Sequence, residues 1–226
     1  MNNNRSIIKM KNIIKYYTKE RTILNQLNLT VPLGDYISIV GESGSGKTTL
    51  LNIICLLDTV NSGDYFLDGT NVLKLNSAQR SKLRNKMLGF VFQSYNLIAR
   101  TTVYDNIILP FLYSDVRLNP ERKEYVDFLL EQFKMKDLRD SYVDDLSGGE
   151  KQRVSFVRAL VLGANIIIAD EPTGNLDPIN TDIILDVFDQ LSKESKTIIV
   201  VTHDSKVAKR AKTKYQLVDG KLIRYD

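Results

Sequence analysis

The sequence predicts an α/β fold with a largely parallel sheet, built around a sizeable buried core. Strand-like apolar segments alternate with helical ones along most of the chain, which is the pattern of strand–helix–strand units. Hydrophobic residues make up 43% of the 226 residues, enough to bury one sizeable core. We therefore expect a single domain over residues 1–226.

The elements expected before residue 94 divide into a parallel core and an antiparallel layer. Residues 36–40 (YISIV) are expected to form a strand that enters a glycine-rich loop. Turn signals on either side of residues 64–67 predict a hairpin there, which should join residues 6–33 in a separate antiparallel layer. The other elements expected here are a helix from Lys47 to about Leu57, a helix over 77–87 and a buried strand over 89–92.

The sequence changes character over residues 94–146, where it predicts a mainly helical insertion. Pro110, Pro120 and the run Glu121–Phe133 indicate helices rather than strands. The strand–helix pattern then resumes, so the core with its antiparallel layer is expected to comprise residues 1–93 and 147–226. The elements expected after the insertion are a helix after Ser147, strands over 166–170 and 197–202, a helix over 181–191 and a hairpin that turns at Asp219–Gly220.

Composition excludes several classes of protein. The longest apolar runs, such as Ile198–Val201, are far shorter than the roughly 20 residues that cross a bilayer. The N-terminus lacks the apolar centre of a signal peptide, so we expect a cytoplasmic chain. The single cysteine, Cys55, excludes an internal disulfide and a Cys-rich metal site. A net charge of +4 is weak evidence for nucleic acid, and no nucleic-acid partner is expected.

The run GESGSGKTT over Gly41–Thr49 fits the pattern of a phosphate-binding loop between a strand and a helix. Gly44 and Gly46 let the backbone turn its N–H groups around phosphate oxygens. Lys47 should reach the β- and γ-phosphates, and the Thr48 hydroxyl should bind Mg²⁺. The alternative is a flexible turn. The nucleotide-binding residues expected here are Gly41, Glu42, Ser43, Gly44, Ser45, Gly46, Lys47, Thr48 and Thr49.

Polar side chains follow three of the expected strands. Asp170 and Glu171 end the apolar run IIIADE; behind a phosphate loop, Asp170 is expected to complete a magnesium shell and Glu171 to deprotonate the attacking water. His203 is the only histidine, and a γ-phosphate contact is favoured over a structural role. Gln93 is either a cap or a ligand of magnesium and water. The alternative for the two acids is a solvated turn.

A second phosphate-type loop stands about a hundred residues after the first. The run LSGGEKQRV over Leu146–Val154 places two glycines behind a serine at the start of a helical stretch, where backbone amides meet anions. The alternative is an ordinary helix N-cap at Ser147, with Glu150 as the capping-box acid. A single nucleotide pocket does not need both loops.

In this order and spacing, GESGSGKTT, LSGGE, IIIADE, NLD (Asn175–Asp177) and TH resemble an ABC-type ATPase cassette over essentially the whole chain. The resemblance implies a phosphate-loop NTPase core of the RecA type, with ATP and Mg²⁺ as cofactors. It also implies a head-to-tail dimer, in which the LSGG loop binds the γ-phosphate of the ATP held by the other copy. The residues assigned to that loop are Ser147, Gly148, Gly149 and Glu150.

The same resemblance assigns roles to further residues. Tyr17 matches the aromatic residue that stacks on adenine, with Tyr16 as the second choice. Asp177 matches the acid of the loop that couples the two sites across the dimer. Glu150 stands where many members of the family have glutamine.

The phrases GFVFQSYNLI, DNIILPFLY and ADEPTGNLD resemble the branch with macrolide-exporter, lipoprotein-release and antimicrobial-peptide-export ATPases. This implies the ATP-hydrolysing subunit of a membrane transporter or mechanical pump, bound to an integral membrane permease at the inner face of the cell membrane. Residues after Gln93 are expected either to form a groove for that permease or to pack in the core: Tyr95, Leu97, Phe111 and Tyr113. The alternatives are an ABC-like regulator of cell division and a soluble ABC ATPase acting on ribosomes or DNA.

Overall fold

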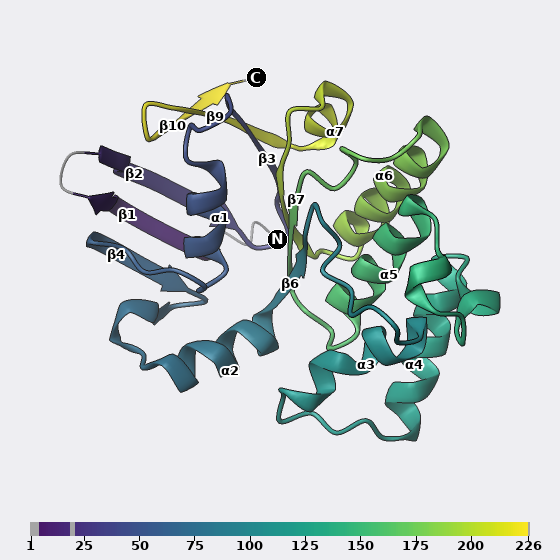
Figure 1. Ribbon diagram of the computed structural model, residues 1–226. Helices are drawn as coiled ribbons and strands as arrows, with labels where there is room; N and C mark the ends of the chain where they lie inside the picture. The colour runs from purple at the N-terminus through teal and green to yellow at the C-terminus, as the bar shows by residue number, and fades with distance from the viewer. Residues whose placement is uncertain (1–4, 19–20, 226) are drawn as a thin grey trace.

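The computed structural model describes residues 5–18 and 21–225 as two sheets with helices packed around them (Figure 1). The larger sheet has six strands in the order β10-β9-β3-β8-β7-β6. All neighbours pair in parallel except β10 and β9, so the expected largely parallel sheet is confirmed. Its strands are β3 (Tyr36–Val40), β6 (Leu88–Val91), β7 (Ile166–Asp170), β8 (Thr197–Val201), β9 (Thr213–Val218) and β10 (Lys221–Tyr225).

A separate antiparallel sheet of four strands is formed by the first part of the chain, as the sequence predicts. The order is β2-β1-β4-β5. The expected hairpin turns at Asp68 and Gly69, whose φ angles are 48° and 78°; this pair of positive angles suits the twist of a two-residue hairpin. The strands are β1 (Ser6–Thr18), β2 (Arg21–Pro32), β4 (Ser62–Leu67) and β5 (Thr70–Asn71).

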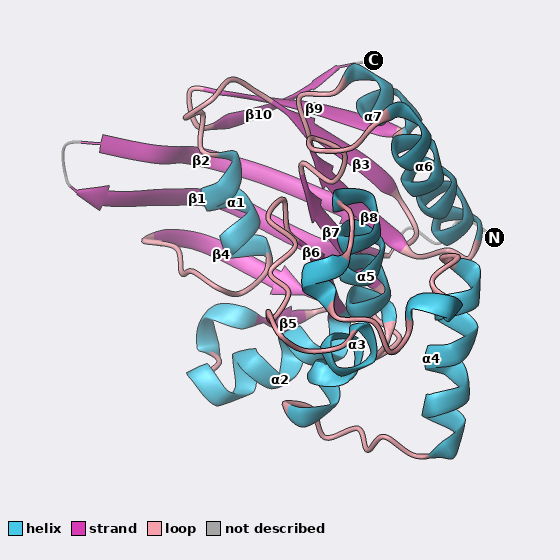
Figure 2. Ribbon diagram, turned by 45° about the vertical axis from the view of Figure 1, so that its right-hand side comes forward, coloured by secondary structure: helices cyan, strands magenta, loops and turns pink. Residues whose placement is uncertain are grey.

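Seven α-helices lie in the described part of the chain. They are α1 (Lys47–Ile54), α2 (Ser77–Met87), α3 (Val103–Leu112), α4 (Pro120–Gln132), α5 (Gly148–Leu160), α6 (Pro178–Lys193) and α7 (Ser205–Arg210). The helices α3 and α4 fall within the expected insertion and pack with α5 on one side of the large sheet (Figures 1 and 2). The division of the chain before residue 94 and after residue 146 remains a prediction. Within residues 5–18 and 21–225, no helix has the length and apolar character needed to cross a bilayer.

Two hydrophobic cores lie on opposite faces of the large sheet. Because successive side chains of a strand point to opposite faces, Ile37 and Ile39 pack with α1 and the antiparallel sheet, whereas Tyr36 packs with α5 and α6. Both faces are covered, which is why β7 and β8 are apolar at nearly every position. The carboxyl edge of the sheet is thereby held rigidly between two packed layers.

Some element boundaries differ from those expected. The first helix ends at Ile54 rather than near Leu57, because Leu56 adopts a left-handed φ of 57°. The helix expected from Thr181 begins three residues earlier, at Pro178. The Asp177 carboxylate caps that turn by accepting from the Asn180 N–H at 2.9 Å, and proline is favoured at a first helical position.

Candidate nucleotide site

A cavity of about 690 Å³ opens at the carboxyl ends of β3, β6, β7 and β8, where the sequence places its polar residues. Most of the expected site residues line it together: Gly41, Glu42, Ser43, Gly44, Gly46, Lys47, Thr48, Thr49, Gln93, Asp170, Glu171 and His203. Four separate elements converge here because parallel strands end at one edge of the sheet.

The loop between β3 and α1 has the backbone that a phosphate cradle needs. Gly44 and Gly46 have φ angles of 78° and 102°, which only glycine adopts at little cost. A Cβ on Gly46 would lie 2.9 Å from Cγ2 of Ile23 on β2, so this glycine is also required by close packing. The Lys47 ammonium donates to the carbonyls of Gly41 at 2.8 Å and Glu42 at 2.7 Å, which holds it inside the curve of the loop.

The Glu171 carboxylate is fixed by His203. His203 Nδ1 lies 2.9 Å from Oε1, and the His203 backbone N–H donates to Oε2 at 3.2 Å. The Glu171 side chain is only 12% exposed, whereas the imidazole is 72% exposed. Glu171 itself has a left-handed φ of 44°, a strained conformation of the kind found where a functional side chain must be aimed. His203 therefore orients the carboxylate; its expected γ-phosphate contact stays a prediction.

Asp170 lies beside Glu171 in the cavity wall. Burial raises the pKa of Asp170, the neighbouring Glu171 carboxylate raises it further, and the Lys47 ammonium opposes both. Thr48 and Gln93 bring a hydroxyl and an amide to the same cavity. Mg²⁺ prefers such oxygen ligands, and a cation there would relieve the repulsion between the two acids. The oxygen atoms of Thr48, Gln93 and Asp170 are thus suitable magnesium ligands, with phosphate oxygens as further ligands.

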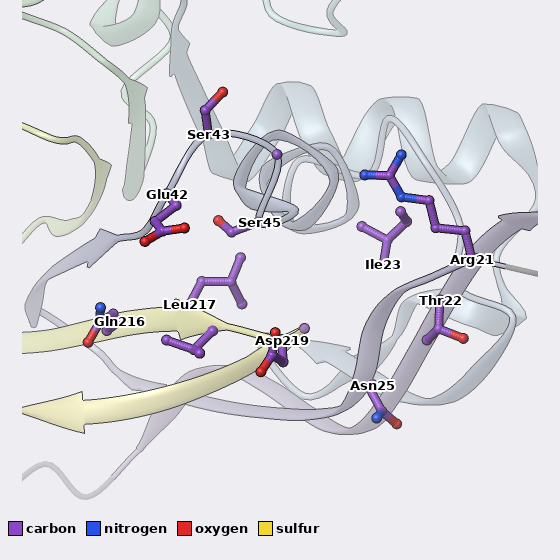
Figure 3. Close-up of a pocket in the computed structure, with 13 residues that line it drawn as sticks. Arg21, Thr22, Ile23, Asn25, Glu42, Ser43, Ser45, Gln216, Leu217 and Asp219 are labelled. Carbon is purple, nitrogen blue, oxygen red and sulfur yellow. The ribbon is translucent and has the colours of Figure 1, made fainter.

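A second cavity of about 550 Å³ lies along the phosphate loop, between β2 and the β9–β10 hairpin (Figure 3). Ser45 lines this cavity and not the first one. Arg21 and Ile23 of β2 line both cavities, although they are not among the residues expected at the site. They carry no motif, and only the pairing of β2 within the antiparallel sheet brings them to the loop.

Tyr17, the residue expected to stack on adenine, is 61% exposed on β1. Its hydroxyl donates to Asp58 at 2.8 Å, and the Lys15 ammonium lies 4.6 Å from its ring centroid. It is not among the described residues that line either cavity. Tyr16 is partly exposed beside it. The adenine contact stays a prediction.

The LSGG loop forms the start of α5, and a capping box fixes it. The Ser147 hydroxyl accepts from the Glu150 N–H at 3.4 Å, while the Glu150 carboxylate accepts from the Ser147 N–H at 2.8 Å. The Ser147 hydroxyl and N–H lower the pKa of Glu150. The described residues that line the two cavities include none from 147–150, nor Asp177. The second loop therefore caps a helix away from this chain's own phosphate cavity.

The residues expected to form a permease groove separate in the structure. Phe111 is buried and Leu97 packs against the same core, so the packing alternative holds for these two. Tyr113 is 76% exposed and, with Leu112, lines a cavity of about 690 Å³ beside α2. Tyr95 lies against the LSGG loop, since a Cβ on Gly148 would be 3.2 Å from the Tyr95 hydroxyl oxygen.

The phosphate loop on a parallel sheet, with its acids at the neighbouring strand ends, defines a phosphate-loop nucleotide-binding protein. The ABC transporter family model matches residues 24–174, and the chain belongs to that family. This range contains the phosphate loop, the LSGG loop and the acidic strand end.

Several known proteins resemble the chain along nearly its whole length. It is 43% identical over 220 residues to YvrO of Bacillus subtilis, an uncharacterised ABC transporter ATP-binding protein, and covers 96% of both chains. It is 41% identical over 217 residues to the macrolide export ATP-binding/permease protein MacB of Campylobacter jejuni, covering 96% of this chain. The chain spans about a third of the length of the macrolide export relatives it matches, 34% in this case.

Two solved structures of the ABC cassette MJ0796 share the fold. The dimeric post-hydrolysis state bound to ADP and Pi has a TM-score of 0.88, with 34% identity and 97% coverage of both chains. A second dimeric structure of this bacterial ABC transporter cassette has a TM-score of 0.86, with 37% identity and coverage of 96% and 97%. The expected fold class and family are confirmed, and the nucleotide state of the first structure agrees with an ATPase.

Proposed function

We propose that this chain is the ATP-binding and ATP-hydrolysing subunit of a membrane ABC transporter, and that it closes on ATP as a head-to-tail dimer. One observation carries the proposal. One cavity is lined by residues 41–44, 46–49, 93, 170–171 and 203, and none of residues 147–150 is among the described residues that line it. The LSGG loop lies away from the phosphate cavity of its own chain, so it is free to bind the nucleotide held by another copy.

Each residue of the cavity has a chemical task in this proposal. The loop N–H groups and the Lys47 ammonium bind the β- and γ-phosphates. Glu171 accepts a proton from the attacking water, and His203 keeps the carboxylate aimed through the two contacts at 2.9 and 3.2 Å. Thr48, Gln93 and Asp170 would hold Mg²⁺, which would supply positive charge against the phosphates. These contacts accelerate ATP hydrolysis because the site binds the transition state more tightly than it binds ATP.

The second copy supplies the remaining contacts. Ser147, Gly148 and Gly149 present N–H groups and the positive end of the α5 dipole to a phosphate. The dimeric structures of MJ0796 support this arrangement, since the chains align over nearly their whole lengths. ATP thus joins two copies, and its hydrolysis lets them part.

The membrane partner is an integral permease, with this subunit bound at the inner face of the cell membrane. The similar macrolide export protein is named as both an ATP-binding protein and a permease. This similarity supports a permease as the partner and a role in export or mechanotransmission. Leu112 and Tyr113 are exposed apolar side chains suited to that contact. A regulator of cell division would use the same cassette, and co-purification of the permease separates the two functions.

Exchange of Glu171 for glutamine tests this function. Glu171→Gln keeps the shape of the side chain but removes the base, so turnover should fall at least about 100-fold, in the range of general-base effects. ATP binding should persist, and ATP should convert the variant into a dimer in gel filtration. Glu124→Gln, the same exchange at an exposed position of α4, should hydrolyse ATP like the parent. A Glu171→Gln protein that stays monomeric at saturating ATP contradicts the proposal.

A further inference from the structure

A hydrogen-bonded cluster joins the start of α6 to the LSGG helix α5, which lie side by side (Figure 1). Asn180 is its centre. The Asn180 amide donates from Nδ2 to the Asp177 carboxylate at 2.6 Å, and its Oδ1 accepts from the Arg153 guanidinium at 2.6 Å. The Asn180 backbone N–H also donates to Asp177 at 2.9 Å. One side chain thus connects the Asp177 cap to α5.

The same side chain presses against the LSGG loop. A Cβ on Gly149 would lie 2.5 Å from Oδ1 and 2.6 Å from Nδ2 of Asn180, distances that real Cβ atoms do not show. Gly149 is buried, and Asn180 is partly buried, so a side chain at position 149 would have to displace the Asn180 amide from its hydrogen bonds. Glycine at position 149 therefore leaves the space that the Asn180 side chain occupies in this chain.

Charges reinforce the cluster from the α5 side. Burial lowers the pKa of Arg153, while the carboxylates of Glu150 and Asp177 act in the opposite direction and favour its charged form. The Arg153 Nε also lies 3.3 Å from the Met135 sulfur in the segment between α4 and α5. Arg153 is therefore anchored on two sides, and its hydrogen bond gives Asn180 a fixed position rather than a mobile one.

We propose that Asn180 is a positioning residue that locks Asp177 and the LSGG loop of one copy into a single rigid surface for the other copy. This inference rests on the proposed head-to-tail dimer. The proposed dimer assigns both elements to the contact with the partner, where each would otherwise lose conformational freedom on association. Ordering them in advance lowers the entropic cost of closing. Asn180 touches no nucleotide in its own chain and acts through Asp177 and Gly149.

Dimer formation in the Glu171→Gln background tests the inference. Sedimentation velocity gives the dissociation constant of the ATP-bound dimer, and a fluorescent ATP analogue at dilute protein gives the nucleotide affinity of the monomer. Asn180→Ala removes all side-chain bonds, and Asn180→Asp keeps the shape and the Arg153 contact but places a carboxylate against Asp177. Asp186→Ala, at an exposed position two turns along α6, is the matched control.

Both Asn180 variants should raise the dimer dissociation constant at least about tenfold, equivalent to about 1.4 kcal/mol. Monomer affinity for nucleotide should match that of Asp186→Ala, since the phosphate cavity is untouched. Asn180 variants whose dimer constants lie within twofold of the control overturn the inference, as does an equal loss of monomer affinity, which would indicate a general structural defect. Failure of the Glu171→Gln parent itself to dimerise would instead refute the proposed function, and the inference with it.

Discussion

The segment that follows Gln93 is held in place by Arg158, and loss of this arginine should affect both stability and catalysis. Tyr95 and Asn96 have left-handed φ angles of 60° and 50°, which strain the tyrosine, whereas asparagine tolerates this region better. The Arg158 guanidinium on α5 donates to their carbonyls, at 2.6 Å to Tyr95 and 2.5 Å to Asn96. Burial lowers the pKa of Arg158.

The expected loss for Arg158→Ala follows from these two bonds. Hydrogen bonds with a charged partner contribute about 1.5–3 kcal/mol each, or about 3–6 kcal/mol for the pair. Because Asn96 is exposed, water can replace part of this, and we expect about 3 kcal/mol less unfolding free energy. For a chain of this size that corresponds to a melting temperature about 6–12 °C lower.

The strained segment should then relax and carry Gln93 with it. A displacement of about 1 Å in a positioning group can reduce turnover by about 100-fold, so kcat should fall at least about tenfold. Nucleotide affinity should change little, because Lys47 and the loop N–H groups are not attached to this segment. The assays are denaturant unfolding, phosphate release at saturating ATP, and nucleotide titration.

Two control variants sharpen the result. Arg158→Lys keeps the charge but not the two-pronged donor, so it should lose about half as much stability. Lys151→Ala removes a cation from the same helix whose nearest acceptor is 3.5 Å away, and it should change stability by less than about 0.5 kcal/mol. An Arg158→Ala protein that loses less than about 1 kcal/mol, or that loses kcat and nucleotide affinity equally, refutes the reasoning.

Three further predictions follow from single contacts. Ser147→Arg should abolish hydrolysis but leave ATP binding to the dilute monomer unchanged, because it blocks only the partner's site. Gly89→Ala should cost about 2 kcal/mol in a thermal melt, since the new Cβ would lie 3.0 Å from the Ala159 carbonyl carbon on α5. Asp58→Asn should lower the unfolding free energy by about 2 kcal/mol at pH 7, because the Lys15 side chain is 7% exposed and its charge would lose its partner. The loss is at the low end for a buried pair because Asp58 is partly exposed.

The Asp58 prediction has a pH dependence of known sign. Partial burial acts to raise the pKa of Asp58, but hydrogen bonds from Lys15 and Tyr17 outweigh it and hold the pKa below its ordinary value of 3.8. When folding lowers the pKa of a carboxyl group, the ionised group stabilises the fold at pH values above its unfolded-state pKa. This contribution to the unfolding free energy is lost as pH falls through the folded-state pKa. The parent and Asp58→Asn should therefore differ at pH 7, and the difference should shrink once pH falls below 3.8 and vanish below the lower folded-state pKa. An equal difference at neutral and acidic pH contradicts the assignment.

Each of the other two predictions has an outcome that contradicts it. For Ser147→Arg it is weaker nucleotide binding by the monomer, which would place Ser147 in its own chain's site. For Gly89→Ala it is a melting temperature equal to the parent's. Gly69→Ala offers a contrast, since its Cβ would meet open space and only the left-handed φ of 78° is penalised.

The sequence by itself determined the features that depend on neighbouring residues. The phosphate loop, the turn at Asp68–Gly69 and the cap at Ser147 need particular residue types at fixed short spacings, because backbone geometry and local hydrogen bonds set them. Apolar runs bounded by turns located the strands of the parallel sheet for the same reason. Chain order and strand ends then predicted that Gln93, Asp170 and His203 would meet.

Only the tertiary structure decided which distant side chains complete these features. Arg21 reaches the phosphate loop through sheet pairing, Arg158 holds the carbonyls of a segment 62 and 63 residues earlier, and Asn180 fills the space beside Gly149. Their residue types are common and no spacing marks them. Such contacts depend on how helices and sheets pack, and packing is a property of the whole chain rather than of any short stretch of it.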